Sequence, residues 1–133
     1  MTTDQLLPLE GMVVLDVSRV LPGGILARQL IDLGARLIKI EEPGTGDPMR
    51  MVPPLVGGVG IGFATLLRGA ESVCLDLTGD EGQTRLRSLA READVLVESF
   101  RPGTMPNWGL GYEAIAEINP RLVWCSLSSF GHG

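Results

Sequence analysis

The sequence predicts an α/β fold with a Rossmann-like open, mainly parallel sheet. Two observations favour this class. Short apolar runs alternate with amphipathic stretches along the chain, which is typical of parallel strands that are connected by helices. The length of 133 residues, of which 44% are hydrophobic, is enough to bury one core. We therefore expect residues 1–133 to belong to a single domain.

The first part of the chain contains two expected strands with a helix between them. Met12–Val17 is nearly continuously apolar and rich in valine, which favours a buried strand. Ile25–Leu33 carries leucines at helical spacing and is followed by Gly34, a common helix stop. We expect the Leu-Pro-Gly-Gly run at 21–24 to separate this helix from the first strand. Arg36–Ile40 is the second expected strand.

The middle of the chain is expected to begin with a long loop. Gly44–Gly62 is rich in glycine and proline and shows no sustained period. Loops of that length within a domain are usually functional or mobile. A short helix is expected over Phe63–Arg68, and Ser72–Leu77 is the third expected strand.

The last part of the chain is expected to complete the sheet. Thr78 and Glu81 match a capping box, which predicts a helix to about residue 92 with a buried stripe of Leu86, Leu89 and Ala90. Three further elements are expected: strand Asp94–Glu98, helix Tyr112–Ile118 and strand Leu122–Leu127. A glycine-rich loop follows the last strand, and no helix follows to cover it, so the domain is expected to be incomplete.

The composition disfavours several classes of function. A formal net charge of −5 and a pI near 4.8 argue against nucleic acid and anionic membranes as partners. The sequence contains neither an apolar run long enough to span a membrane nor a secretory leader pattern, which predicts a cytoplasmic protein. Cys74 and Cys125 lie in apolar runs and are expected to be buried thiols, not a disulfide or a metal site.

A ligand is expected at the carboxyl ends of the strands, as in other open α/β sheets. Asp16 and Asp76 lie near this edge, where each carboxylate faces a ligand or simply accepts hydrogen bonds from turn amides. Arg19, Arg50 and Arg101 are the basic residues in the expected loops there. They are either phosphate ligands or solvated side chains.

Other known nucleotide and catalytic patterns match poorly. The loop at 18–24 lacks the G-x-G-x-x-G fingerprint of dinucleotide sites, and no glycine run precedes a P-loop lysine. His132, the only histidine, is expected to be exposed and not a catalytic base. The serines at 126, 128 and 129 lack a nucleophile elbow and are expected to be loop hydroxyls. The residues alone therefore predict half of a Rossmann-like domain, which could bind an anionic ligand.

Five sequence blocks, in order, resemble the amino-terminal part of family III CoA-transferases, the family that also includes formate and carnitine CoA-transferases and α-methylacyl-CoA racemases. Each block by itself is weakly specific for the family, but five blocks in this order are strongly specific. The blocks are Leu9–Leu21, Leu33–Glu41 with Pro43–Pro48 and Arg50, Ser72–Leu77, Ala93–Gly103 with Gly109–Tyr112, and Asn119–Val123 with Ser126–Gly131.

This resemblance implies a Rossmann-like large domain that binds coenzyme A, within a protein about three times longer that forms interlocked homodimers. It implies acyl-CoA and a carboxylic acid as substrates, and no permanently bound cofactor or metal. In such transferases an aspartate attacks the thioester and forms an anhydride, then an aspartyl-CoA thioester. That aspartate, like the His and Asp of the racemases, would lie downstream of Gly133. We therefore expect this chain by itself to be inactive and to hold no catalytic residue.

The resemblance also implies binding residues, position by position. Leu21 and Pro22 match the loop along the adenine and phosphate end of CoA. Leu75, Asp76, Leu77 and Thr78 match the stretch beneath the nucleotide. Ser99, Phe100 and Arg101 match the loop after the fourth strand, where Arg101 corresponds to a basic CoA contact in some members.

Several cations of the family pattern are replaced in this chain. Glu42 and Asn107 stand where relatives often have arginine, and Thr78 stands where they often have lysine. The basic run before the third strand is reduced to Arg68. These changes leave Arg50, Arg68 and Arg101 as candidates to hold phosphates. They also leave three hypotheses: an active transferase or racemase, a degenerate half that acts beside a working partner, and a separate Rossmann module for another nucleotide.

Overall fold

The computed structural model of the protein describes residues 6–131. Its main sheet has five strands, all parallel, in the order β5-β2-β1-β6-β7. The strands are β1 (Val13–Asp16), β2 (Arg36–Glu41), β5 (Glu71–Cys74), β6 (Val95–Glu98) and β7 (Val123–Ser126). The predicted open parallel sheet is thus confirmed. Because all strands are parallel, their carboxyl ends meet at one edge.

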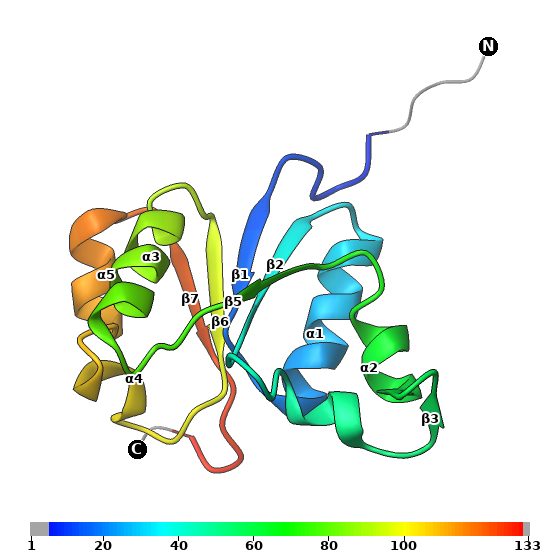
Figure 1. Cartoon of the computed structure of the whole chain (residues 1–133). Coiled ribbons are helices and arrows are strands. Elements are labelled where there is room, and N and C mark those ends of the chain that lie inside the picture. Colours follow the sequence, from blue (N-terminus) through cyan, green and yellow to red (C-terminus); the bar gives the residue numbers. More distant parts are fainter. Residues whose placement is uncertain (1–5, 132–133) are drawn as a thin grey trace.

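Helices cover both faces of this sheet (Figure 1). Helices α1 (Val20–Asp32) and α2 (Ile61–Leu66) lie on one side, and α3 (Asp80–Ala90), α4 (Thr104–Asn107) and α5 (Tyr112–Ile118) lie on the other. Each face has its own core: Ala27, Leu37 and Phe63 on the first side, and Leu15, Leu86 and Ile115 on the second. No helix within residues 6–131 is long and apolar enough to cross a membrane.

Helix α1 differs from the prediction because it begins five residues earlier, at Val20. The expected break contains Pro22, but this proline lies in the first turn, where a helix needs no backbone donor. Gly23 and Gly24 are then part of the helix, and both are buried. The prediction that residues 21–24 lie between the first strand and the helix is wrong for this reason.

The segment from Gly44 to Gly62 is not a plain loop. It contains a 3₁₀ helix, η1 (Pro48–Met51), and a small hairpin of β3 (Leu55–Val56) and β4 (Val59–Gly60). The hairpin was not predicted because each strand has only two residues, too few to show an alternating pattern. Helix α2 follows directly at Ile61, two residues before the expected start.

The predicted capping box at the start of α3 is not formed. Gly79 is the N-cap, and no side chain caps the helix. Thr78 Oγ1 donates instead to Asp76 Oδ1 at 2.6 Å. The rest of this region largely follows the prediction: Leu86 and Ala90 are buried, and α5 has the expected bounds, although α4 was not expected.

The two cysteines are free thiols, as expected, but only one is partly buried. Cys125 on β7 is half-buried, whereas Cys74 is exposed. The predicted burial of Cys74 is wrong because β5 is an edge strand of the sheet and leaves this side chain at the surface.

Candidate functional site

Two adjoining cavities open at the carboxyl edge of the sheet. The larger has a volume of about 700 Å³ and lies between the loops that follow β1, β6 and β7. The smaller, of about 60 Å³, lies between the loops that follow β1, β2 and β5. Arg19 and Phe100 line both cavities, so the two adjoin and together make up the candidate site.

Nine of the eleven predicted binding residues line these cavities. The larger is lined by Pro22, Ser99, Phe100 and Arg101, and the smaller by Glu42, Leu75, Asp76, Leu77 and Thr78 as well as Phe100. Leu21 and Asn107 line neither. Leu21 lies exposed in the first turn of α1, and Asn107 lies exposed at the end of α4. Leu75 and Asp76 also border a third cavity, of about 870 Å³, beside α3.

The loop after β1 is held by a buried carboxylate. Asp16 Oδ1 accepts hydrogen bonds from the Ser18 amide at 2.9 Å and from the Ser18 hydroxyl. Gly23 packs directly on this turn, where a Cβ would lie 1.6 Å from Ser18 Oγ. Asp16 therefore acts on turn groups, the second of the two roles that the sequence left open for it.

A buried lysine connects this turn to the loop after β2. Lys39 Nζ lies 3.2 Å from Asp16 Oδ2 and 3.3 Å from Asp47 Oδ2, and it donates to the Ser18 carbonyl. All of these side chains are almost completely buried. Sequence reasoning missed this cluster, although a lone lysine within the apolar strand Arg36–Ile40 indicates that buried carboxylates lie nearby.

Asp47 also occupies the amino end of α1. Both of its carboxylate oxygens lie 3.4 Å from the Val20 amide nitrogen, and Oδ1 accepts from the Met49 amide at 2.8 Å. In dinucleotide-binding folds this end of the helix holds the pyrophosphate. Here the protein's own carboxylate takes that place, which agrees with the missing glycine fingerprint.

Arg50 is not available as a phosphate ligand. It forms a bidentate ion pair with Glu41, with two N–H···O distances of 2.6 Å, and its guanidinium lies 3.9 Å from the centre of the Phe63 ring. Burial by itself raises the pKa of Glu41, but hydrogen bonds from Arg50, Ser72 and the Asp47 amide outweigh it and lower this pKa to about 2. The candidate role of Arg50 in binding phosphate is therefore replaced by a structural one.

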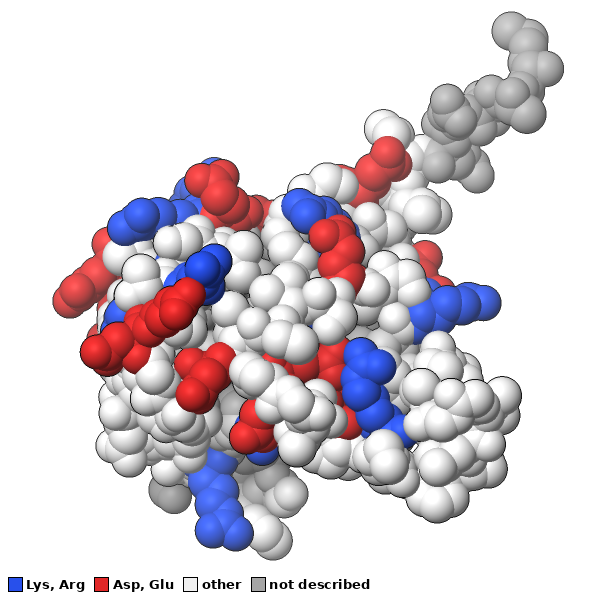
Figure 2. Space-filling view, in the orientation of Figure 1, with Lys and Arg blue, Asp and Glu red and all other residues white. Residues whose placement is uncertain are grey.

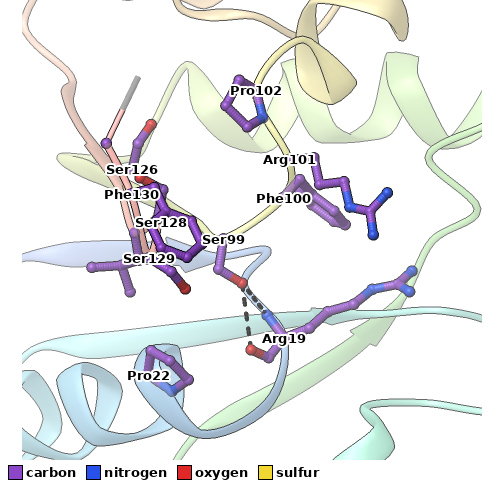
Figure 3. Close-up of a pocket in the computed structure, with 12 residues that line it drawn as sticks. Arg19, Pro22, Ser99, Phe100, Arg101, Pro102, Ser126, Ser128, Ser129 and Phe130 are labelled. Carbon is purple, nitrogen blue, oxygen red and sulfur yellow. Dashed lines mark hydrogen bonds between the residues drawn. The ribbon is translucent and has the colours of Figure 1, made fainter. Parts of the chain in front are cut away.

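Arg19 and Arg101 line the larger cavity, and Figure 3 shows both side chains extending past Phe100, away from the serines. Arg19 pairs with Glu42 at 3.2 Å and lies 5.3 Å from the centre of the Phe100 ring. Its backbone is fixed by Ser99, whose hydroxyl accepts from the Arg19 amide at 2.8 Å. Arg101 is exposed and forms no salt bridge within residues 6–131. Arg68, the other candidate cation, lines neither cavity.

Hydroxyl groups line the opposite wall of the larger cavity. Figure 3 places Ser126, Ser128 and Ser129 across from the two arginines. Ser126 Oγ accepts a hydrogen bond from the Trp124 indole at 2.8 Å. In the smaller cavity Thr78 donates to Asp76 through its hydroxyl and its amide, which lowers the pKa of Asp76. The three serines line the larger cavity: Ser126 is the last residue of β7, and Ser128 and Ser129 lie in the loop after it, as the sequence predicted.

Among the described residues, neither a histidine nor a metal centre contributes to the site. His132 lies outside the described residues. Within residues 6–131 no group of His, Cys, Asp and Glu side chains is arranged to hold a metal ion. The site consists of two arginines, one partnered by Glu42, together with an aromatic ring, serine hydroxyls and carboxylates. Such a set fits an extended ligand with both anionic and apolar parts.

Comparison with known proteins shows the family to which this chain belongs. The family model for CoA-transferase family III matches residues 9–133. The chain therefore belongs to the family III CoA-transferases, as its sequence blocks indicated.

Particular relatives agree with this assignment. The chain is 45% identical over 124 residues to an acetyl-CoA:oxalate CoA-transferase of Acetobacter aceti, and it covers 32% of that protein. It is 40% identical over 125 residues to a human succinyl-CoA:glutarate CoA-transferase, of which it covers 28%. In each case 93% of this chain is aligned. The chain thus spans about a third of the length of these relatives.

The fold is also similar to that of a solved structure. A CaiB/BaiF family protein from Brucella suis superimposes with a TM-score of 0.90 at 39% sequence identity. The superposition covers 97% of this chain and 35% of the other. The similarity therefore extends across the whole described sheet and its helices.

Proposed function

We propose that this chain forms the nucleotide-binding part of an enzyme that transfers coenzyme A between an acyl-CoA and a carboxylic acid. One observation carries the proposal: nine of the eleven positions matched to the family's CoA site line two adjoining cavities at one sheet edge. The named relatives act on CoA esters of small acids. Because those relatives are transferases, we propose transfer and not racemisation.

The larger cavity offers complementary groups for such a ligand. Arg101 supplies a cation for a phosphate, and the serine hydroxyls across the cavity supply hydrogen bonds. Phe100 and Pro22 supply apolar surface for the adenine or the pantetheine arm. A charge-assisted bond of this kind contributes about 1.5–3 kcal/mol.

We further propose that the attacking aspartate comes from outside residues 1–133. The aspartates near the site are already engaged: Asp16 and Asp47 bind buried Lys39, and Asp76 accepts two hydrogen bonds from Thr78. A carboxylate stabilised in this way is a weak nucleophile towards a thioester. The nucleophile would come from a further segment or from a paired subunit, such as the second copy in a homodimer.

Calorimetric titration of the chain with CoA tests the binding proposal. We expect one CoA site per chain, with a dissociation constant that rises by about tenfold or more when Arg101 is replaced by alanine. Absence of binding would contradict the proposal. For the transfer step, the protein from its native source is weighed by denaturing mass spectrometry and assayed for acyl-CoA exchange with carboxylic acids. A mass of about three times 14.2 kDa together with exchange would support it.

A second candidate is a non-catalytic half that acts beside a working subunit. The observation that favours it is the pairing of Arg19 with Glu42 and of Arg50 with Glu41, which leaves few cations for phosphates. Titration of the intact assembly with CoA separates the two. Equivalent sites on all subunits would exclude the non-catalytic half.

A further inference from the structure

The carboxyl edge of the sheet, where the candidate site lies, carries more negative than positive charge. Six carboxylates and four cations lie at the carboxyl ends of the strands: Asp16, Glu41, Glu42, Asp47, Asp76 and Glu98, against Arg19, Lys39, Arg50 and Arg101. Three of the cations are already in ion pairs. On the face seen in Figure 2, basic and acidic groups are interspersed and form no continuous basic patch.

Glu42 is an exposed carboxylate at this edge, as is Asp76. It follows Glu41, the last residue of β2, and its side chain is 53% exposed. It lines the smaller cavity together with Asp76, and its one salt bridge within residues 6–131 is to Arg19 at 3.2 Å. Glu41 beside it is buried and is bound by Arg50.

This place in a doubly wound sheet has a known chemistry. An acidic side chain at the end of the second strand accepts hydrogen bonds from the hydroxyls of a ribose, whereas an arginine there accommodates a phosphate on the ribose. A ribose phosphate next to Glu42 and Asp76 would meet two carboxylates. Within residues 6–131 Arg19 is the one cation that lines the smaller cavity, and it is already paired with Glu42, so a phosphate there would compete with that carboxylate.

We infer that Glu42 makes the nucleotide end of the site select a ribose without a phosphate. This inference rests on the proposed function. CoA carries a phosphate on its ribose, and dephospho-CoA lacks it, so the chain binds dephospho-CoA as tightly as CoA or more tightly. Glu42 then sets the specificity for the nucleotide, while Arg101 and the serines hold the part that both ligands share.

The experiment compares the two ligands on the same protein. Dissociation constants for CoA and dephospho-CoA are measured by calorimetry at one ionic strength, for the unaltered chain and for Glu42→Gln and Glu42→Arg. Glu117→Gln is the matched control, because Glu117 is an exposed carboxylate on α5 that lines neither cavity. Thermal melting checks that each variant is folded.

We expect the unaltered chain to bind CoA no tighter than dephospho-CoA. Glu42→Arg should shift the ratio of the two constants towards CoA by at least about tenfold, and Glu42→Gln should shift it less in the same direction. Glu117→Gln should leave the ratio unchanged. A tenfold preference of the unaltered chain for CoA, or a ratio that does not respond to Glu42→Arg, would overturn the inference alone. If neither ligand binds, the proposed function fails together with it.

Discussion

Lys39 Nζ lies 3.3 Å from Asp47 Oδ2 in the interior, where each side chain is only 3% exposed. This ion pair connects β2 to the loop that follows it. Asp47 then reaches the Val20 amide at the start of α1. One buried pair therefore fixes the position of the helix end that borders the candidate site.

Asp47→Ala should destabilise the fold strongly. It leaves Lys39 with one carboxylate partner and removes the acceptor of the Val20 and Met49 amides. Breaking a buried pair from one side costs about 3–5 kcal/mol. Urea unfolding measures the loss. The control is Asp32→Ala, which removes the exposed pair with Arg28 and should cost less than about 1 kcal/mol; equal losses in the two variants would contradict the role of Asp47.

The ion pair of Glu41 and Arg50 should make stability depend on acid pH. The pKa of Glu41 falls from 4.5 to about 2 on folding, so its contribution is present above pH 4.5 and is lost as the pH falls towards 2. The difference corresponds to about 3 kcal/mol. Glu41→Gln removes this titration. Unfolding free energies of both proteins should differ at pH 7 and converge near pH 2, and a difference that does not change with pH would refute the assignment.

The sequence predicted the sheet well because strand formation depends on local apolar runs. Each of the five expected strands is present, and the matched binding positions follow because the carboxyl ends of parallel strands meet. The predicted starts of two helices were wrong where a residue type is compatible with two structural roles. The sequence predicts a break at Pro22, which lies in the first turn of α1, and a helix cap at Thr78, whose hydroxyl donates to Asp76 instead.

The charge pairing of the site could not be predicted from local patterns. Arg19 and Glu42 are 23 residues apart in sequence, and so are Lys39 and Asp16. Which cation meets which carboxylate depends on the order of the strands in the sheet. The sequence therefore indicated where Arg50 lies but not that Glu41 neutralises it.

Val20→Gly should raise stability. Val20 has a φ of +62° and is the one non-glycine residue within residues 6–131 with a positive φ. Such a backbone strains a β-branched residue by about 1–3 kcal/mol, and glycine relieves the strain at an entropic cost of about 0.5–1 kcal/mol. The control is Leu21→Gly, which has no such strain to relieve and should lower stability by about 1 kcal/mol. Thermal melting compares the two, and a lower melting temperature for Val20→Gly would contradict the expectation.

The two thiols should react at different rates. Cys74 is exposed, whereas Cys125 is half-buried. Burial, assisted by the nearby Glu98, raises the pKa of Cys125 and so lowers its thiolate fraction. A thiol-reactive dye should therefore modify Cys74 first in the folded protein. Cys74→Ser should remove the fast phase and leave a slow one, and a fast phase that persists in this variant would show that Cys125 is accessible.

Arg101→Ala should weaken CoA binding by about tenfold or more, because it removes the cation of the larger cavity that has no carboxylate partner within residues 6–131. Arg121→Ala is the matched control, since Arg121 is also exposed but precedes β7 at the opposite edge of the sheet. Titration calorimetry gives both dissociation constants. The effect of Arg101→Ala should shrink as salt is added, because screening weakens an exposed charge–phosphate contact. If both variants bind CoA equally well, the phosphate is held elsewhere and Arg101 has no role in binding.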